Sequence, residues 1–221
     1  MRFLITAGPT REPIDPVRYL TNRSSGKMGY AVASAALAAG HEVCLISGPV
    51  SLAAPEGAEV HFVESAREMY NTVQEKINAA DVAVFSAAVA DYRVAEEADQ
   101  KIKKSDDLLT LTLVKNPDIL GNTRSEFGFE GILVGFAAET NDLEKHAASK
   151  LTRKECDLLV ANDVSRKGIG FECDENEVIL FYKSGESKML SLSSKTDIAI
   201  ELVSEIDPVS YTHLRAHETS I

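Results

Sequence analysis

The stretch that most constrains the fold covers residues 21–40, TNRSSGKMGYAVASAALAAG. It begins with polar residues and glycine, continues as an alanine-rich helical segment and stops at Gly40. Because alanine side chains are small, the backbone of such a helix can lie close against a β-sheet. Gly29 removes a side chain near the helix start and helps the same close approach. The segment therefore predicts a tightly packed helix of an α/β layer.

The start of this helix is a candidate anion site. Ser24, Ser25 and Gly26 precede it. The N–H groups of a first helical turn have no intrahelical partner and lie at the positive end of the helix dipole. A phosphate is a usual occupant of such a site. Serine and glycine also cap many helices that bind nothing, so a packed helix without a ligand fits the pattern equally well.

Apolar runs and helical patterns alternate along the rest of the chain. The runs are short and bounded by turn residues, which is typical of buried parallel strands. They cover residues 2–7, 42–46, 61–63, 81–88, 131–137 and 157–161. Helical patterns follow at residues 66–77, 141–154 and 194–206. We therefore predict an α/β fold, a Rossmann-like, doubly wound and mostly parallel sheet with helices on both faces.

Other segments predict antiparallel strands or irregular structure. Residues 178–182 and 188–192 flank a Ser-Gly turn and predict a β-hairpin, and residues 108–114 alternate leucine with threonine. We expect these strands to form a small antiparallel arm or edge extension. Residues 8–23 contain three prolines and predict a long loop.

We predict one domain over residues 1–207. The remaining residues 208–221, PVSYTHLRAHETSI, continue no pattern and resemble translated vector read-through, so we expect this tail to lie outside the fold. His213 and His217 have the i, i+4 spacing of a zinc-binding pair, but no further ligand residues accompany them. The sequence leaves the identity of any metal ligand unknown.

Charge and cysteine usage exclude several classes of partner. The net charge of −11 disfavours nucleic acid and membrane surfaces, because phosphate backbones and anionic lipids need a basic face. No apolar run approaches the roughly 20 residues that span a bilayer. Cys44, Cys156 and Cys173 lack metal-binding spacing and indicate reduced thiols. We therefore expect a cytoplasmic protein that binds small molecules, not nucleic acid or membranes.

The first loop lacks a dinucleotide-binding fingerprint. G-x-G-x-x-G would directly follow the first strand, and an acidic residue would end the second. Instead, AGPTREP follows the first strand and Ser47-Gly48 ends the second. Gly26-Lys27 also lacks the glycine spacing of a Walker motif. An NAD(P)-dependent Rossmann oxidoreductase remains an alternative, weakened by the missing fingerprint.

Candidate binding residues gather where ligands bind in doubly wound sheets, at the carboxyl ends of the strands. Small residues at 86–90 leave room for a flat ligand, and Asp91 could accept hydrogen bonds from a ribose or base. A turn or capping aspartate is an equally good interpretation of Asp91. Phe136 ends a predicted strand and is a core residue by default, although its ring could also stack on a base.

Lysines supply the candidate positive charge. Lys101 opens the KIKK run in a polar segment, where a lysine on a closing flap could neutralise charge that develops on phosphate. Such runs are more commonly solvated surface. Lys150 and Lys154 lie on one face of a predicted helix and could reach phosphates, although an exposed helix face is the commoner interpretation.

Several motifs in order resemble one family. GPTREPIDPVRYLTNRSSGKMG, SAAVADYR, KIKK, KNPDIL, GFAAET and AND (residues 161–163) closely resemble phosphopantothenoylcysteine synthetase, the ligase domain of the bifunctional coenzyme A biosynthesis proteins. The resemblance covers about residues 2–206. In many bacteria this domain is fused behind a flavin-dependent decarboxylase. The chain starts at the first strand, so we expect a decarboxylase to be a possible separate partner or to be missing from this sequence.

The resemblance implies a CTP-dependent ligase. The carboxylate of 4'-phosphopantothenate attacks the α-phosphate of CTP and releases pyrophosphate, giving an acyl-cytidylate. The amine of L-cysteine then attacks the acyl carbon and expels CMP. Magnesium accompanies the triphosphate. The family is dimeric, so a homodimer is expected, with the arm as the natural contact.

The resemblance also assigns roles to residues. Asn22 would help to bind and convert the acyl-cytidylate, and Lys101 would be the catalytic flap lysine. Ser24, Ser25 and Gly26 fit the anion site described above. The positions that match nucleotide-binding residues are Ala87, Ala88, Asp91, Asn116, Pro117, Asp118, Ile119, Phe136, Lys150 and Lys154. Preference for CTP over ATP does not follow from the residues. A non-catalytic nucleotide-binding subunit on the same fold is a third alternative.

Overall fold

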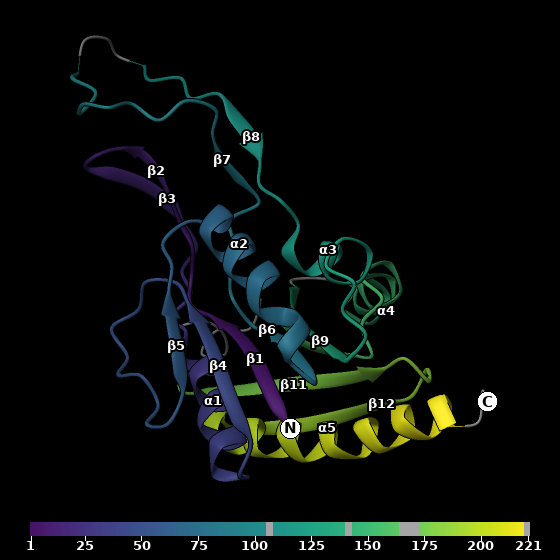
Figure 1. Ribbon diagram of the computed structural model, residues 1–221. Helices are drawn as coiled ribbons and strands as arrows, with labels where there is room; N and C mark the ends of the chain where they lie inside the picture. Colours follow the sequence, from purple (N-terminus) through teal and green to yellow (C-terminus); the bar gives the residue numbers. More distant parts are fainter. Residues whose placement is uncertain (105–107, 140–142, 164–172, 219–221) are drawn as a thin grey trace.

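The computed structural model describes residues 1–104, 108–139, 143–163 and 173–218, and an eight-stranded sheet forms its centre (Figure 1). The strand order across the sheet is β12-β11-β10-β9-β6-β1-β4-β5. The six strands from β10 to β5 are parallel, whereas β11 and β12 add an antiparallel edge. Their bounds are β1 Arg2–Ala7, β4 Glu42–Ser47, β5 Glu59–Phe62, β6 Val82–Phe85, β9 Ile132–Glu139, β10 Leu158–Asp163, β11 Glu175–Tyr182 and β12 Ser187–Ser194. The predicted fold class and edge hairpin are confirmed.

The direction of winding changes next to β1. From β1 the chain adds β4 and β5 on one side, and then crosses to add β6, β9 and β10 on the other. The loops after β1 and β6 continue side by side, because the amide of Ala88 donates to the carbonyl oxygen of Gly8 at 2.9 Å. A crevice at the carboxyl ends of two such strands is the usual ligand site of doubly wound folds.

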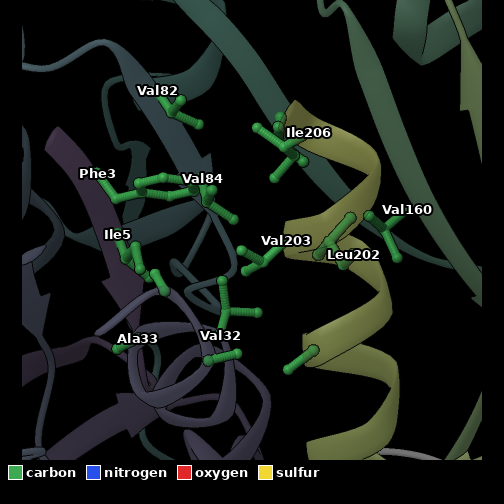
Figure 2. Close-up of a cluster of buried hydrophobic side chains, with 14 of the residues drawn as sticks. Phe3, Ile5, Val32, Ala33, Val82, Val84, Val160, Leu202, Val203 and Ile206 are labelled. Carbon is green, nitrogen blue, oxygen red and sulfur yellow. The ribbon is translucent and has the colours of Figure 1, made fainter. Parts of the chain in front are cut away.

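Helices cover both faces of the sheet. Helices α1 (Lys27–Ala38) and α5 (Lys195–Glu218) pack on one face. Helices α2 (Ala66–Lys76), α3 (Ile119–Ser125) and α4 (Leu143–Arg153), with the short helix η1 (Ile77–Ala79), belong to the core on the other face. In Figure 2, Val32 of α1 and Val203 of α5 lie beside Val84 of the sheet. None of the helices in the described ranges combines the length and apolarity needed to cross a bilayer.

The alanine-rich helix lies as close to the sheet as its sequence predicts. A Cβ atom added at Gly29 would lie only 2.6 Å from the Cβ atom of Ala7, so glycine is required at this contact. Beyond the helix, Gly40 has a φ of 84°, a left-handed conformation that suits glycine and ends the helix.

The predicted loop at residues 8–23 contains a β-hairpin instead. Strand β2 (Arg11–Asp15) pairs with β3 (Arg18–Thr21) as a separate two-stranded ribbon. Pro13 is tolerated because a two-stranded ribbon has free edges that need no N–H donor. The hydroxyl of Thr21 closes the base of the hairpin by donating to the carbonyl oxygen of Thr10 at 2.7 Å. The prediction of a loop was wrong, because prolines exclude a helix but are compatible with an edge strand.

Two further boundaries differ from the sequence predictions. The strand predicted at 108–114 is shorter and shifted: β8 (Leu113–Lys115) pairs with β7 (Tyr92–Val94) as a second ribbon. Both ribbons project from the same end of the sheet (Figure 1). Helix α5 continues to Glu218, well beyond the predicted end at residue 206. The domain boundary near residue 207 stays a prediction.

Candidate functional site

A cavity of about 510 Å³ opens at the switch point of the sheet, where Thr6 of β1, Phe85 of β6 and Phe136 of β9 line it. The loop after β6, the turn before α3 and one side of α4 form its walls. The structure brings together here nine of the residues that resemble nucleotide-binding positions: Ala87, Asp91, Asn116, Pro117, Asp118, Ile119, Phe136, Lys150 and Lys154. These residues are spread over 68 positions of the sequence, and the parallel topology places them around one space.

Asn116 joins two walls of this cavity. Its side-chain amide donates to the carbonyl oxygen of Ala90 at 2.9 Å, and its backbone amide donates to the carbonyl oxygen of Asp91 at 2.8 Å. Asp118 caps α3, since its Oδ1 atom accepts from the amide of Gly121 at 2.9 Å. The two aspartates therefore differ: Asp118 is partly engaged by a helix start, whereas Asp91 lines the cavity as an exposed residue without capping a helix.

Lys150 of α4 and Lys154, which directly follows this helix, face the cavity and not open solvent. The Nζ atom of Lys150 donates to the carbonyl oxygen of Phe136 at 2.8 Å. Lys154 forms an ion pair with Asp118, and its side chain is only 12% exposed. Burial lowers the pKa of Lys154 below its ordinary value, with Cys156 and Asp91 acting in the opposite direction. Both ammonium groups thus lie at the wall of a polar cavity, where they could bind an anion in place of their present partners.

The predicted anion site at the start of α1 is not part of this cavity. Gly26 is the N-cap residue, with a φ of 77°, and it offers no side chain to the first turn. Its amide lies 3.3 Å from the hydroxyl of Ser24. A Cβ atom added at Gly26 would lie 2.7 Å from the side chain of Val50, so only glycine fits. Ser24, Ser25 and Gly26 therefore form a second, separate element of the candidate site.

Asn22 connects this element to the cavity. Its side-chain Nδ2 atom lies 3.1 Å from the carbonyl oxygen of Ala88 and 3.3 Å from that of Val89. Ala88 itself does not line the cavity, but its neighbours Ala87 and Val89 do. The loop after β6 is therefore shared by the cavity on one side and by the segment that leads into α1 on the other.

Lys101 lies apart from the cavity walls. It is exposed, and the next residue, Ile102, is hydrogen-bonded to Asp15 at the tip of the β2–β3 hairpin. Asp15 and Arg18 are not among the residues that the sequence predicted for the site. Their signal was an acidic and a basic residue three positions apart around Pro16, a spacing that allows an ion pair across a turn. Residues 105–107, later in the same polar segment, lie outside the described residues.

One group of metal-ligand side chains occurs among the described residues, and it lies elsewhere. Potential ligand atoms of Cys44, Glu59 and His61 lie within 4.8 Å of one another. Glu59 begins β5, so the group lies toward the amino ends of the strands. Its carboxylate already accepts from Arg2 at 2.8 Å, His61 at 2.8 Å and Lys76 at 3.1 Å. These contacts describe a satisfied ion-pair network. The side chains of the predicted His213–His217 pair lie outside the described residues.

The cysteines agree with the prediction of reduced thiols. Cys44 and Cys156 are buried, Cys173 is partly exposed, and all three are free. Burial raises the pKa of Cys156 to about 12, so this thiol stays protonated although it lies next to the lysines of the site. Cys156 is therefore a packing residue and not a nucleophile.

The fold and the site together define a doubly wound α/β domain with a polar cavity at its topological switch point. Residues 1–209 match the family of DNA/pantothenate metabolism flavoprotein C-terminal domains, and the chain belongs to this family. The resemblance inferred from the motifs is confirmed at this level.

Similar proteins include the coenzyme A biosynthesis bifunctional protein CoaBC of Vibrio vulnificus strain YJ016, which is 51% identical over 206 residues. CoaBC of Bacillus subtilis strain 168 is 50% identical over 208 residues. These alignments cover 92% and 94% of the chain but 51% of each relative, so the chain spans about half the length of the curated relatives it matches. A crystal structure of the C-terminal domain of a CoaBC protein superimposes with a TM-score of 0.79 at 40% identity and covers 94% of each chain.

Proposed function

We propose that this domain is a phosphopantothenate–cysteine ligase, which uses CTP to join 4'-phosphopantothenate and L-cysteine in coenzyme A biosynthesis. The observation that carries the proposal is the convergence of nine motif residues on one cavity at the switch point of the sheet. Family membership supports the same conclusion, because the similar proteins are named for coenzyme A biosynthesis.

The reaction proceeds in two steps. The carboxylate of phosphopantothenate attacks the α-phosphorus of CTP, and the bond to the β-phosphate breaks to release pyrophosphate. The amine of cysteine then attacks the acyl carbon, CMP leaves with the electron pair of the acyl–oxygen bond, and the amine loses a proton. Activation is needed because a carboxylate is a poor acyl donor, whereas CMP is a good leaving group.

The residues of the cavity fit the nucleotide. Lys150 and Lys154 would supply positive charge for phosphate oxygens, Phe136 of β9 offers an apolar surface, and residues 116–119 would border the base. Asn22 lies at the junction between the cavity and the start of α1, where the acyl-cytidylate would form. Lys101 would come from the polar segment and neutralise charge on the transferring phosphoryl group.

Magnesium fits this cavity as a companion of the triphosphate. Mg²⁺ prefers oxygen ligands and is commonly held by one or two carboxylates together with phosphate oxygens. Asp91 and Asp118 are the carboxylates that line the cavity. Among the described residues, no trio of potential ligand side chains converges there, so phosphate oxygens would provide most of the coordination. When bound, the ion offsets the negative charge of the triphosphate.

The same proposal includes a homodimer. Apolar side chains are exposed on both ribbons: Val17 is 58% exposed, Tyr19 45%, Tyr92 47% and Leu113 44%. Such side chains on neighbouring projections suit burial against a second copy of the chain. A decarboxylase that removes CO2 from the cysteine carboxylate of the product would be a separate or fused partner, and the reaction would take place in the cytoplasm.

The decisive experiment measures pyrophosphate release with each nucleoside triphosphate, with and without phosphopantothenate and cysteine. The proposal predicts release with CTP that requires phosphopantothenate, and amide formation that also requires cysteine. Binding of CTP without pyrophosphate release would identify a non-catalytic nucleotide-binding subunit. Thermal stabilisation by NADPH but not by CTP would point to the oxidoreductase alternative and contradict the proposal.

A further inference from the structure

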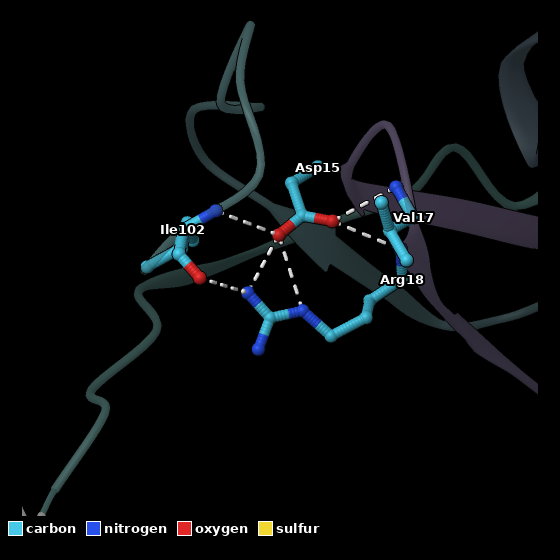
Figure 3. A network of polar contacts seen from close by, with 4 residues as sticks. All are labelled: Asp15, Val17, Arg18 and Ile102. Carbon is cyan, nitrogen blue, oxygen red and sulfur yellow. Dashed lines mark hydrogen bonds and ion pairs between the residues drawn. The ribbon is translucent and has the colours of Figure 1, made fainter. Parts of the chain in front are cut away.

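The buried carboxylate of Asp15 lies at the tip of the β2–β3 hairpin (Figure 3). It accepts hydrogen bonds from the hairpin itself and from the segment around Ile102, which is distant in sequence. The Oδ1 atom of Asp15 accepts from the backbone amides of Val17 and Arg18, both at 2.9 Å. Its Oδ2 atom accepts from Arg18 Nε at 3.1 Å, Arg18 Nη2 at 2.6 Å and the backbone amide of Ile102 at 3.1 Å. Arg18 Nη2 also donates to the carbonyl oxygen of Ile102 at 3.2 Å. Both backbone groups of Ile102 are therefore fixed to the hairpin.

The contact depends on a charged carboxylate. The side chain of Asp15 has 0% exposure, whereas that of Arg18 is 42% exposed. A carboxylate only accepts hydrogen bonds, and all five of its partners here are donors. The Arg18 guanidinium holds the pKa of Asp15 well below its usual range. An amide at this position would turn one acceptor into a donor, and the new NH2 group would face either the Ile102 amide and the guanidinium or the backbone amides of Val17 and Arg18, all of which are donors.

A second contact anchors the same segment without Asp15. The backbone amide of Ala98 donates to the carbonyl oxygen of Ile14 at 3.0 Å. The segment after β7 thus follows the hairpin at two points, one made by backbone alone at Ala98 and one made by a side chain at Ile102. Loss of the Asp15 carboxylate would release the second point and leave the first in place.

We propose that Asp15 is a positioning residue. Through Arg18 and the backbone of Ile102, it fixes the backbone next to Lys101, from which the Lys101 side chain extends. The inference rests on the proposed function, because only that function gives Lys101 a role in catalysis. Holding the attachment point removes backbone freedom before the nucleotide arrives. Small displacements of a catalytic group of about 1 Å can cost a factor on the order of 10² in rate.

The first test measures the anchor itself. In Asp15→Asn, hydrogen exchange of the Ile102 amide should accelerate at least about tenfold, as expected when a hydrogen bond to a charged group is lost. Exchange at Ala98 should stay as in the parent protein. Glu12→Gln is the matched control, because Glu12 is also a buried carboxylate of β2 but accepts from Ala66 at the start of α2. Unchanged exchange at Ile102 in Asp15→Asn would overturn the inference.

The second test measures catalysis. Asp15→Asn should lower kcat for pyrophosphate release by roughly tenfold to a hundredfold, with little change in the Kd of CTP, whose other contacts lie in the cavity. Glu12→Gln should keep the parent kcat. Accelerated exchange at Ile102 together with an unchanged kcat would show an anchor without a positioning role and would overturn the inference.

A double variant separates the inference from the proposed function. If Asp15 acts through Lys101, then Asp15→Asn combined with Lys101→Gln should be no slower than Lys101→Gln alone. If the kcat losses of the two single variants add in the double variant, Asp15 does not act through Lys101. A reduced kcat in Asp15→Asn together with a parental kcat in Lys101→Gln would refute action through Lys101 as well. Pyrophosphate release itself, measured on the parent protein, decides the proposed function independently. Ile102→Pro deletes the N–H donor in a segment without helix or strand, and should reproduce the kcat loss if Asp15→Asn fails to fold.

Discussion

The side-chain amide of Asn22 donates to the carbonyl oxygen of Ala88 at 3.1 Å and thereby joins two loops that are 66 positions apart. One loop leads into α1, and the other leaves β6 and forms a wall of the cavity. This hydrogen bond lies beside β1, where the winding of the sheet changes direction. A change at Asn22 should therefore affect the junction of the two elements more than the cavity itself.

Asn22→Asp is expected to impair product formation by at least about tenfold while changing CTP affinity less. The aspartate cannot donate to the two carbonyl oxygens and would place a negative charge beside the acyl phosphate; loss of such contacts costs about 1–3 kcal/mol. Single-turnover product formation and equilibrium CTP binding would be compared. Asn71→Asp, at an exposed position of α2, is the control. Equal losses in both measurements would contradict the junction role.

Lys101→Gln is expected to reduce pyrophosphate release by about 10² or more, because removal of a group that stabilises transition-state charge has this effect in other enzymes. The melting temperature should not change, since Lys101 is exposed. Lys103→Gln, at an exposed position of the same segment, should retain activity. If Lys101→Gln turns over nearly as fast as the parent protein, Lys101 is not the catalytic lysine of the flap.

Lys154→Gln is expected to weaken CTP binding roughly tenfold to a hundredfold, because a charge-assisted hydrogen bond contributes about 1.5–3 kcal/mol. The lysine lies at the cavity wall beside Asp118, and the variant would also leave that carboxylate without its cation. Isothermal titration with CTP measures the effect. Lys145→Gln removes the same charge from an exposed position of α4, and a comparable loss there would mean that net charge, not the cavity contact, decides affinity.

Glu59→Gln is expected to lower the free energy of unfolding at pH 7 by about 1 kcal/mol, the upper value for partly exposed ion pairs. His61 and then Lys76 hold the pKa of Glu59 at about 2, below its ordinary 4.5. A lowered pKa stabilises the fold fully above pH 4.5, and this contribution is lost as pH falls toward 2. Urea unfolding should therefore show the gap between parent and variant closing over this range.

Glu75→Gln, at an exposed position of α2, is the control for the pH experiment and should show a small difference that does not depend on pH in this way. A constant gap for Glu59→Gln from pH 7 to pH 2 would mean that Arg2, His61 and Lys76 do not stabilise the charged carboxylate.

Much of the candidate site could be predicted because its residues lie in contiguous motifs. The turn at Asn116 to Ile119 and Phe136 of β9 line one cavity, and the family resemblance predicts nucleotide binding at these positions. The orientation of Lys150 and Lys154 could not be read from their spacing, since one helix face can meet solvent or a cavity. That face was decided by how α4 packs over β9 and β10, which turns both side chains toward Phe136 and Asp118.

The sequence by itself determined the alternation of buried strands and helices, the close packing of α1 through Gly29, and the edge of the sheet at which the candidate residues gather. These features depend on local patterns of apolar and small residues. Only the tertiary structure decided that residues 8–23 form a hairpin, that Asp15 holds Ile102 across 87 positions, and that Ser24 to Gly26 stand apart from the cavity. The physical reason is that these features depend on polar contacts between loops distant in sequence, and such contacts leave no periodic signal along the chain.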